Sequence, residues 1–201
     1  MASRVDYLGL YELQDRVLAS AMSAETDLYL TGGTCLHRFY YERRYSDDLD
    51  LFSADAALFR DYLRETLETL EGDGYRLEIL VDTHDFVRAT VNGTLKIDVV
   101  NDRVLRYGRS VRTEGGLRID NIGNITANKI TAIVGRDEPK DVFDLFILAR
   151  NESFDWKEIL KAAERKSVFE REYLLYRLVT VQLLSEGMYR KIYRLDFSFA
   201  L

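Results

Sequence analysis

The spacing of apolar residues predicts alternating helices and strands in the first part of the chain. Apolar positions recur every three or four residues in the opening segment, as on one face of a helix, whereas between residues 48 and 52 they alternate with polar positions, as in a half-buried strand. The predicted helices of this part cover residues 5–22, 34–41 and 56–70. The predicted strands cover residues 28–31, 48–52, 76–81, 86–91 and 95–100, with a tight hairpin turn at Asn92-Gly93.

Helical spacing dominates the second part of the chain. The predicted helices there cover residues 122–134, 142–149, 156–163 and 169–184. The Gly- and Arg-containing stretch 103–116 is expected to be a loop. The order predicts an α+β fold, a mixed β-sheet flanked by helices and followed by a C-terminal helical region. We expect an α/β core over residues 1–120 and a helical region over 121–201 that completes a cleft, or one continuous domain.

The composition is that of a globular protein. Of the 201 residues, 47% are apolar and 31% are charged, and the longest apolar stretches are too short for a transmembrane helix. The amino terminus has no secretion-signal pattern, and Cys35 is the only cysteine, which excludes an internal disulfide and a cysteine-based zinc site. We therefore expect a cytoplasmic protein without a membrane partner. The net charge of −6 argues against a protein that coats nucleic acids.

Two carboxylates are predicted to share one face of the strand at residues 48–52. Asp48 and Asp50 are two positions apart, so their side chains would stand roughly 7 Å apart or closer, while Leu49 and Leu51 point into the core. At an effective dielectric constant near 20 such charges repel by about 2 to 3 kcal/mol. A divalent cation would relieve this repulsion, and carboxylate ligands suit magnesium or manganese. The alternative interpretation is a strand with a solvated acidic face.

A glycine turn and a third carboxylate extend this pattern. Gly32-Gly33-Thr34 follows the predicted strand 28–31, and a helix start after such a turn presents backbone N–H groups and a hydroxyl that suit a phosphate. The alternative is an ordinary glycine turn. On the strand 95–100, Asp98 and Lys96 share the polar face.

These motifs occur in the order of a known enzyme superfamily. Gly32-Gly33-Thr34, then Asp48-Leu49-Asp50, then Asp98 on a later strand, resemble the DNA polymerase β-like nucleotidyltransferases. More narrowly, segments 32–36 and 42–51, together with 128–145, are similar to the AbiEii/AbiGii-type abortive-infection toxins, including the MenT-type toxins. The resemblance covers most of residues 28–150, and Lys140 stands where this family more often has arginine.

The resemblance implies a nucleotidyltransferase-type fold and metal-assisted transfer of an NMP group from an NTP to an acceptor hydroxyl. Two Mg²⁺ or Mn²⁺ ions would bridge the triphosphate and the acceptor. The implied metal ligands are Asp48, Asp50 and Asp98, and the implied catalytic residues are these three with Lys129 and Asp141. The implied nucleotide-binding residues are Gly32, Gly33, Thr34, Ser46, Lys129 and Asp144.

Several of these residues have structural alternatives. Lys129 is equally typical of a solvated helix residue, and Asp141 of the first turn of a helix. Ser46 would support the loop before its strand or lie beside the metal. The adjacent Arg43 and Arg44 are expected to be solvated, with phosphate binding as the alternative.

The sequence leaves three functions open. The first is a nucleotidyltransferase toxin that modifies tRNA or another RNA and is restrained by an antitoxin. The second is transfer to a small molecule, as in antibiotic-modifying enzymes, which the acidic net charge favours. The third is a nucleotide-binding interaction module without catalysis, which the presence of all three carboxylates disfavours.

Overall fold

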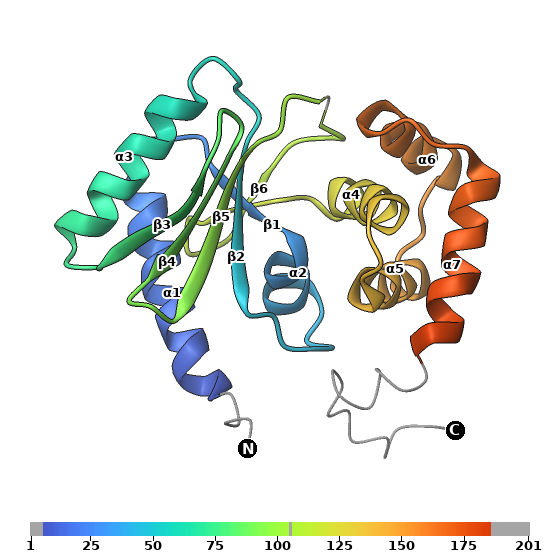
Figure 1. Cartoon of the computed structure of the whole chain (residues 1–201), viewed down its shortest axis with the longest axis horizontal. Coiled ribbons are helices and arrows are strands. Elements are labelled where there is room, and N and C mark those ends of the chain that lie inside the picture. Colours follow the sequence, from blue (N-terminus) through green and yellow to red (C-terminus); the bar gives the residue numbers. More distant parts are fainter. Residues whose placement is uncertain (1–5, 105, 186–201) are drawn as a thin grey trace.

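The computed structural model describes residues 6–104 and 106–185, which form a seven-stranded mixed sheet and a helical region (Figure 1). The strands are β1 (Tyr29–Thr31), β2 (Asp48–Ser53), β3 (Leu77–Asp82), β4 (Phe86–Val91), β5 (Leu95–Asn101), β6 (Val111–Arg112) and β7 (Arg118–Ile119). The helices are α1 (Tyr7–Ser23), α2 (Gly32–Cys35), the π-helical turn η1 (Leu36–Tyr40), α3 (Phe59–Gly72), α4 (Ile122–Gly135), α5 (Pro139–Asn151), α6 (Trp156–Lys166) and α7 (Arg171–Ser185). The α+β fold class is confirmed.

The sheet has the strand order β3-β4-β5-β2-β1-β7-β6. The pairs β2/β5 and β1/β7 are parallel, and the other neighbouring pairs are antiparallel. The expectation of a loop over residues 103–116 was incomplete, because the two-residue strand β6 lies within it and pairs with β7. Strands this short carry too few residues to show a period of two.

Alternation along β2 and β5 gives the central strands one apolar face and one polar face. Leu49 and Leu51 of β2 and Ile97 of β5 are buried in a core that also contains residues of α1 and α3. The opposite face carries the side chains of β2 and β5 that the sequence predicts to be polar. Helices α4 to α7 lie on the side of the sheet that carries this polar face (Figure 1).

The hairpin between β4 and β5 sets which side chains of these strands face each other. Asn92 and Gly93 both have positive φ, 54° and 68°, as the predicted tight turn requires. Val91 then pairs with Leu95, and the same register pairs Arg88 with Asp98. The turn therefore places an arginine directly opposite the third predicted carboxylate.

Helix α5 begins at Pro139, three residues earlier than expected. Proline is tolerated in the first turn because the N–H that it lacks has no helical partner there. The earlier start places Lys140 and Asp141 in the first turn of α5.

The helical region has a hydrophobic cluster of its own. Buried side chains of α4, α5, α6 and α7 form it, and Phe154 packs against both this cluster and the core of the sheet. The division at residue 120 stays a prediction. Within residues 6–104 and 106–185, the helices are all too short or too polar to cross a bilayer.

Candidate active site

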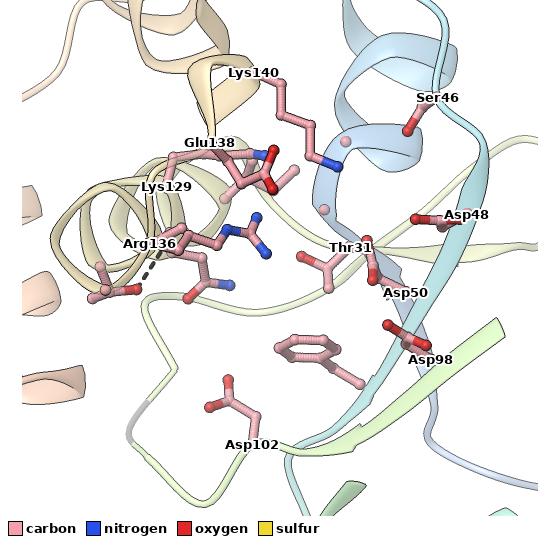
Figure 2. Close-up of a pocket in the computed structure, with 18 of the residues that line it drawn as sticks. Thr31, Ser46, Asp48, Asp50, Asp98, Asp102, Lys129, Arg136, Glu138 and Lys140 are labelled. Atoms are coloured by element: carbon pink, nitrogen blue, oxygen red, sulfur yellow. Dashed lines mark hydrogen bonds between the residues drawn. The ribbon is translucent and has the colours of Figure 1, made fainter. Parts of the chain in front are cut away.

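A pocket of about 710 Å³ lies between the polar face of the sheet and helices α4 and α5. This volume is in the usual range for small-molecule sites. Strand residues supply carboxylates on one side, and the helices supply basic side chains on the other (Figure 2). Of the predicted site residues, Gly32, Gly33, Ser46, Asp48, Asp50, Asp98 and Lys129 line the pocket. Thr34, Asp141 and Asp144 lie behind its wall.

The three carboxylates come from two adjacent parallel strands. Asp50 of β2 pairs in register with Asp98 of β5, and Asp48 pairs with Lys96. The β2 positions alternate between partly exposed and buried, so Asp48 and Asp50 point to the same side. Residues separated by about 50 positions in the sequence are thereby brought to one wall of the pocket.

Two of these carboxylates have basic partners on the same sheet. Lys96 Nζ lies 2.6 Å from Asp48 Oδ2. Arg88 donates two hydrogen bonds to Asp98, from Nε to Oδ1 at 2.8 Å and from Nη2 to Oδ2 at 2.7 Å. The Lys96 and Arg88 side chains are 33% and 38% exposed, so solvent screens both pairs.

Asp50 differs from its two neighbours, because within the described residues its carboxylate has neither a hydrogen-bond nor an ion-pair partner. It lies against Gly32, where an added Cβ would overlap the Asp50 carboxylate. Gly32 also has a φ of 72°, which other residues adopt only with strain. Burial and the neighbouring charge of Asp98 raise the pKa of Asp50 to about 6. Asp50 and Asp98 therefore place two carboxylates side by side in this part of the pocket.

The donor set fits a divalent cation in its chemistry. Oxygen ligands from three carboxylates suit Mg²⁺ or Mn²⁺, and such an ion would favour the charged form of Asp50, which burial and Asp98 disfavour. Among residues 6–104 and 106–185, however, no three His, Cys, Asp or Glu side chains are arranged as a metal cage. Asp48 and Asp98 are held instead in ion pairs with Lys96 and Arg88.

The glycine turn packs closely on the loop that precedes β2. A Cβ on Gly33 would lie 2.5 Å from Arg44 Nη2 and 3.0 Å from Ser46 Oγ. The Thr34 hydroxyl donates a hydrogen bond to the Asp48 carbonyl and is buried. In the structure Thr34 therefore ties the turn to the start of β2, and its proton is not directed at the pocket.

Lys129 is held by two buried aspartates of α5. Its Nζ lies 2.8 Å from Asp141 Oδ1 and 2.7 Å from Asp144 Oδ2, and the lysine is only 6% exposed. Burial alone would lower the pKa of Lys129, but the charges of the two aspartates outweigh it and raise that pKa above its usual value. Lys129 lines the pocket with a charge that the protein already neutralises.

Asp144 joins the helical region to the glycine-turn side of the fold. Arg44 donates two hydrogen bonds to it, at 2.7 and 2.6 Å, and His37 Nε2 lies 2.7 Å from its Oδ1. Burial would raise the pKa of Asp144, but Lys129 and these hydrogen bonds outweigh it and hold the pKa well below its usual value. The expectation that Arg44 is solvated was wrong: its side chain is 5% exposed.

Asp141 has a similar environment. Its carboxylate accepts hydrogen bonds from Lys129 and from Arg136, the latter at 2.7 and 3.1 Å. Although burial would raise the pKa of Asp141, Lys129 and Arg136 lower it. The carboxylate itself is fully buried.

Most of the other lining residues were absent from the predicted set, among them the basic residues Arg88, Lys96 and Lys140. Lys96 lies two positions before Asp98 on the same strand, so the sequence already placed its side chain on the same polar face. Counting back from the Asn92-Gly93 turn would have placed Arg88 opposite Asp98. The one sequence feature that pointed to Lys140 as a site residue was its position, where the family more often has arginine.

The match to a family model covers nearly the whole chain. The chain belongs to the family described as nucleotidyl transferase AbiEii toxin, Type IV TA system, which matches residues 16–201. Nucleotidyltransferases of this type typically use divalent metals.

Individual proteins are similar to this chain in fold or in sequence. JHP933 from Helicobacter pylori is 22% identical, with a TM-score of 0.56 over 94% of this chain and 96% of that one. MenT4, a nucleotidyltransferase toxin from Mycobacterium tuberculosis H37Rv, is 17% identical, with a TM-score of 0.56 over 79% of this chain and 63% of that one. Both show the fold. "Uncharacterized protein aq_aa25" from Aquifex aeolicus is 29% identical over 142 residues, and the match spans 70% of this chain and 66% of that protein's length.

Proposed function

We propose that the chain is a metal-dependent nucleotidyltransferase that moves an NMP group from an NTP to an acceptor hydroxyl and acts as the toxin of a toxin–antitoxin system. The family membership supports the class of reaction and the biological setting. The observation that carries the proposal is Asp50, a carboxylate that has no partner in the part of the chain that the structure describes and that lies between the glycine turn and Asp98 in one pocket.

Asp48, Asp50 and Asp98 would hold Mg²⁺ or Mn²⁺ in this proposal. Bound there, the ions would supply neutralisation of charge on the attacking and leaving oxygens. The acceptor oxygen forms a bond to the α-phosphorus while the bond from that phosphorus to the pyrophosphate oxygen breaks. The acceptor proton passes to Asp98, which stands on the strand beside Asp50.

Gly32, Gly33 and Ser46 are proposed to form the phosphate-facing wall, because all three line the pocket. For Thr34, Asp141 and Asp144 the buried contacts support a positioning role: Thr34 holds the start of β2, and the two aspartates hold Lys129. Such residues act on the reaction through the side chains that they orient.

We propose tRNA or another RNA as the acceptor. The basic lining residues are Arg44, Arg88, Lys96, Lys129, Arg136, Lys140 and Lys166, and the acidic ones are Asp48, Asp50, Asp98, Asp102 and Glu138. Two further carboxylates, Asp141 and Asp144, pair with basic lining residues from behind the wall, so the charges around the pocket are close to balance in a chain whose net charge is −6. A small-molecule acceptor and a non-catalytic nucleotide-binding module are the alternatives.

The test is transfer of label from each of the four α-labelled NTPs to total RNA, in the presence of Mg²⁺ or Mn²⁺. We expect labelled RNA with the wild type and none with Asp50→Asn. Asp82→Asn, which removes an exposed carboxylate of β3, is the control and should match the wild type. Nucleotide binding without transfer to RNA or to any small acceptor would contradict the catalytic proposal.

The antitoxin is tested separately in cells. Induction of the wild-type chain should arrest growth, whereas Asp50→Asn should not. Co-expression of the neighbouring gene should restore growth if that gene encodes the antitoxin. Growth arrest that persists in the Asp50→Asn strain would contradict a toxin that acts by nucleotide transfer.

A further inference from the structure

Lys140 differs from the other cations of the pocket because it has no partner among the residues that the structure describes. It follows Pro139 in the first turn of α5, and its side chain extends across the pocket toward α2 (Figure 2). Within residues 6–104 and 106–185, its ammonium makes no hydrogen bond or ion pair. A lysine left unpaired while it points into a pocket is available to a ligand.

The other basic side chains of the lining are paired with carboxylates of the protein. The pairs are Arg44–Asp144, Arg88–Asp98, Lys96–Asp48, Lys129–Asp141, Lys129–Asp144, Arg136–Asp141 and Lys166–Asp102. A triphosphate carries several negative charges, and a cation without a counter-ion can bind it without first giving up a partner in the protein. Among the described lining residues Lys140 meets this condition.

Lys129 is poorly suited to the same task. Two aspartates neutralise its charge, and its side chain is 7% exposed. To reach a phosphate, Lys129 would have to leave two buried carboxylates, which would then keep only their other partners, Arg136 at Asp141 and Arg44 with His37 at Asp144. Removing one charge from such a buried network is costly. Lys140 needs no such rearrangement.

Lys140 also lies across the pocket from the carboxylate wall. Figure 2 shows its side chain on one side of the pocket and Asp48, Asp50 and Asp98 on the other. A triphosphate bound through metal ions to these carboxylates would lie between them and Lys140.

We propose that Lys140 is the residue that binds the triphosphate of the nucleotide, and that Lys129 is a positioning residue within the buried network. This inference rests on the proposed function. It assigns the triphosphate contact to a residue outside the set that the sequence predicts. Lys129, which the sequence predicts to bind the nucleotide, is given a structural role instead.

The test compares Lys140→Met with Lys157→Met. Lys157 is the second residue of α6, as Lys140 is of α5, and its side chain also has no partner among the described residues, but it lies outside the pocket lining. Affinities for ATP, GTP, CTP and UTP, and for the matching monophosphates, are measured by calorimetry with Mg²⁺. Each variant is also checked for its melting temperature.

We expect Lys140→Met to weaken binding of the preferred triphosphate by roughly 10- to 100-fold, the usual value of a hydrogen bond to a charged group. Monophosphate affinity and melting temperature should not change, and Lys140→Arg should restore triphosphate binding. Lys157→Met should match the wild type throughout. Lys129→Met should lower the melting temperature, because it leaves Asp141 and Asp144 with fewer partners.

The outcomes separate this inference from the proposed function. If the wild type binds a triphosphate and Lys140→Met binds it equally well, the role of Lys140 is overturned and the proposed function stands. If Lys140→Met weakens monophosphate and triphosphate binding alike, the contact is not with the triphosphate and the inference is again overturned. If the wild type binds none of the four triphosphates, the proposed function fails and this inference fails with it.

Discussion

Two arginine–aspartate pairs on opposite sides of the pocket have nearly the same geometry and very different surroundings. Arg88 and Asp98 are joined by two hydrogen bonds of 2.8 and 2.7 Å, and Arg44 and Asp144 by two of 2.7 and 2.6 Å. The side chains of the first pair are 38% and 11% exposed, whereas those of the second are 5% and 0% exposed. Burial, and not hydrogen-bond geometry, therefore separates the two.

The difference in burial suits the sheet side and the helical side of the pocket to different roles. Solvent screens the Arg88–Asp98 pair, so a metal ion or substrate can replace the arginine at small cost. The Arg44–Asp144 pair is part of a dry network, where loss of one partner leaves a buried charge. The sheet wall is suited to exchange partners during a reaction, and the helical wall is suited to stay fixed.

The largest expected effect comes from breaking the buried network. Asp144→Asn keeps the shape of the side chain but removes the charge that Lys129 and Arg44 share. We expect the free energy of unfolding to fall by about 3 to 5 kcal/mol, measured by urea denaturation. Asp82→Asn, which removes the partner of Arg60 on the surface, should leave stability unchanged. Equal stability of the two variants would show that burial does not separate the pairs.

The second effect concerns the contact between Gly32 and Asp50. Gly32→Ala combines an unfavourable φ with overlap of its Cβ and the Asp50 carboxylate, so we expect a loss of about 2 to 4 kcal/mol. Gly74→Ala is the control: its φ is 87°, but an added Cβ meets nothing within 4 Å, so it should lose only about 1 kcal/mol. Similar losses in urea unfolding would mean that Asp50 does not press on the turn.

The third effect has the opposite sign and depends on pH. Because the folded pKa of Asp50 is about 6 and the ordinary value is 3.8, the folded state binds the proton more tightly and loses stability as pH rises through this window. Asp50→Asn removes this loss, so it should be more stable than the wild type by roughly 1 to 3 kcal/mol at pH 7. The difference should shrink toward pH 4. Urea unfolding at several pH values would refute this if the two curves stay parallel.

The smallest effect on stability is expected for Arg88→Met. Its exposed pair should contribute no more than about 1 kcal/mol, whereas Arg44→Met, which breaks the matched buried pair, should cost several times as much. Mn²⁺ titration adds a second measurement: without Arg88, Asp98 is free, and Mn²⁺ should bind more tightly than to the wild type. Weaker Mn²⁺ binding would show that Arg88 and the metal do not compete for Asp98.

Much of the fold could be predicted because its main elements have strong periodic patterns. The strands with Asp48-Leu49-Asp50 and with Lys96-Ile97-Asp98 alternate cleanly, and β4 was predicted at its observed bounds. The strands β6 and β7 could not be found in this way. Their two-residue length carries no period, and their pairing depends on tertiary contacts with β1.

The candidate site was predictable in its acidic half and less so in its basic half. Asp48 and Asp50 are placed by alternation within one strand, which is a local property. Arg44 is a loop residue in the sequence, and its burial depends on Asp144, a hundred positions later. Such partners become visible only when the helical region packs beside the glycine turn, so Arg44 could not be told from a solvated arginine.

The Asn92-Gly93 turn has a consequence for how this pocket tolerates change in length. Strand side chains point alternately to the two faces of the sheet, so a change that shifted the pairing of β4 with β5 by one residue would carry Arg88 to the opposite face from Asp98. Three uncharged residues, Asn92, Gly93 and Thr94, thus govern the counter-charge of a carboxylate that they never touch. A change in the length of this turn that altered the register would break the ion pair between Arg88 and Asp98 without changing any ionisable residue.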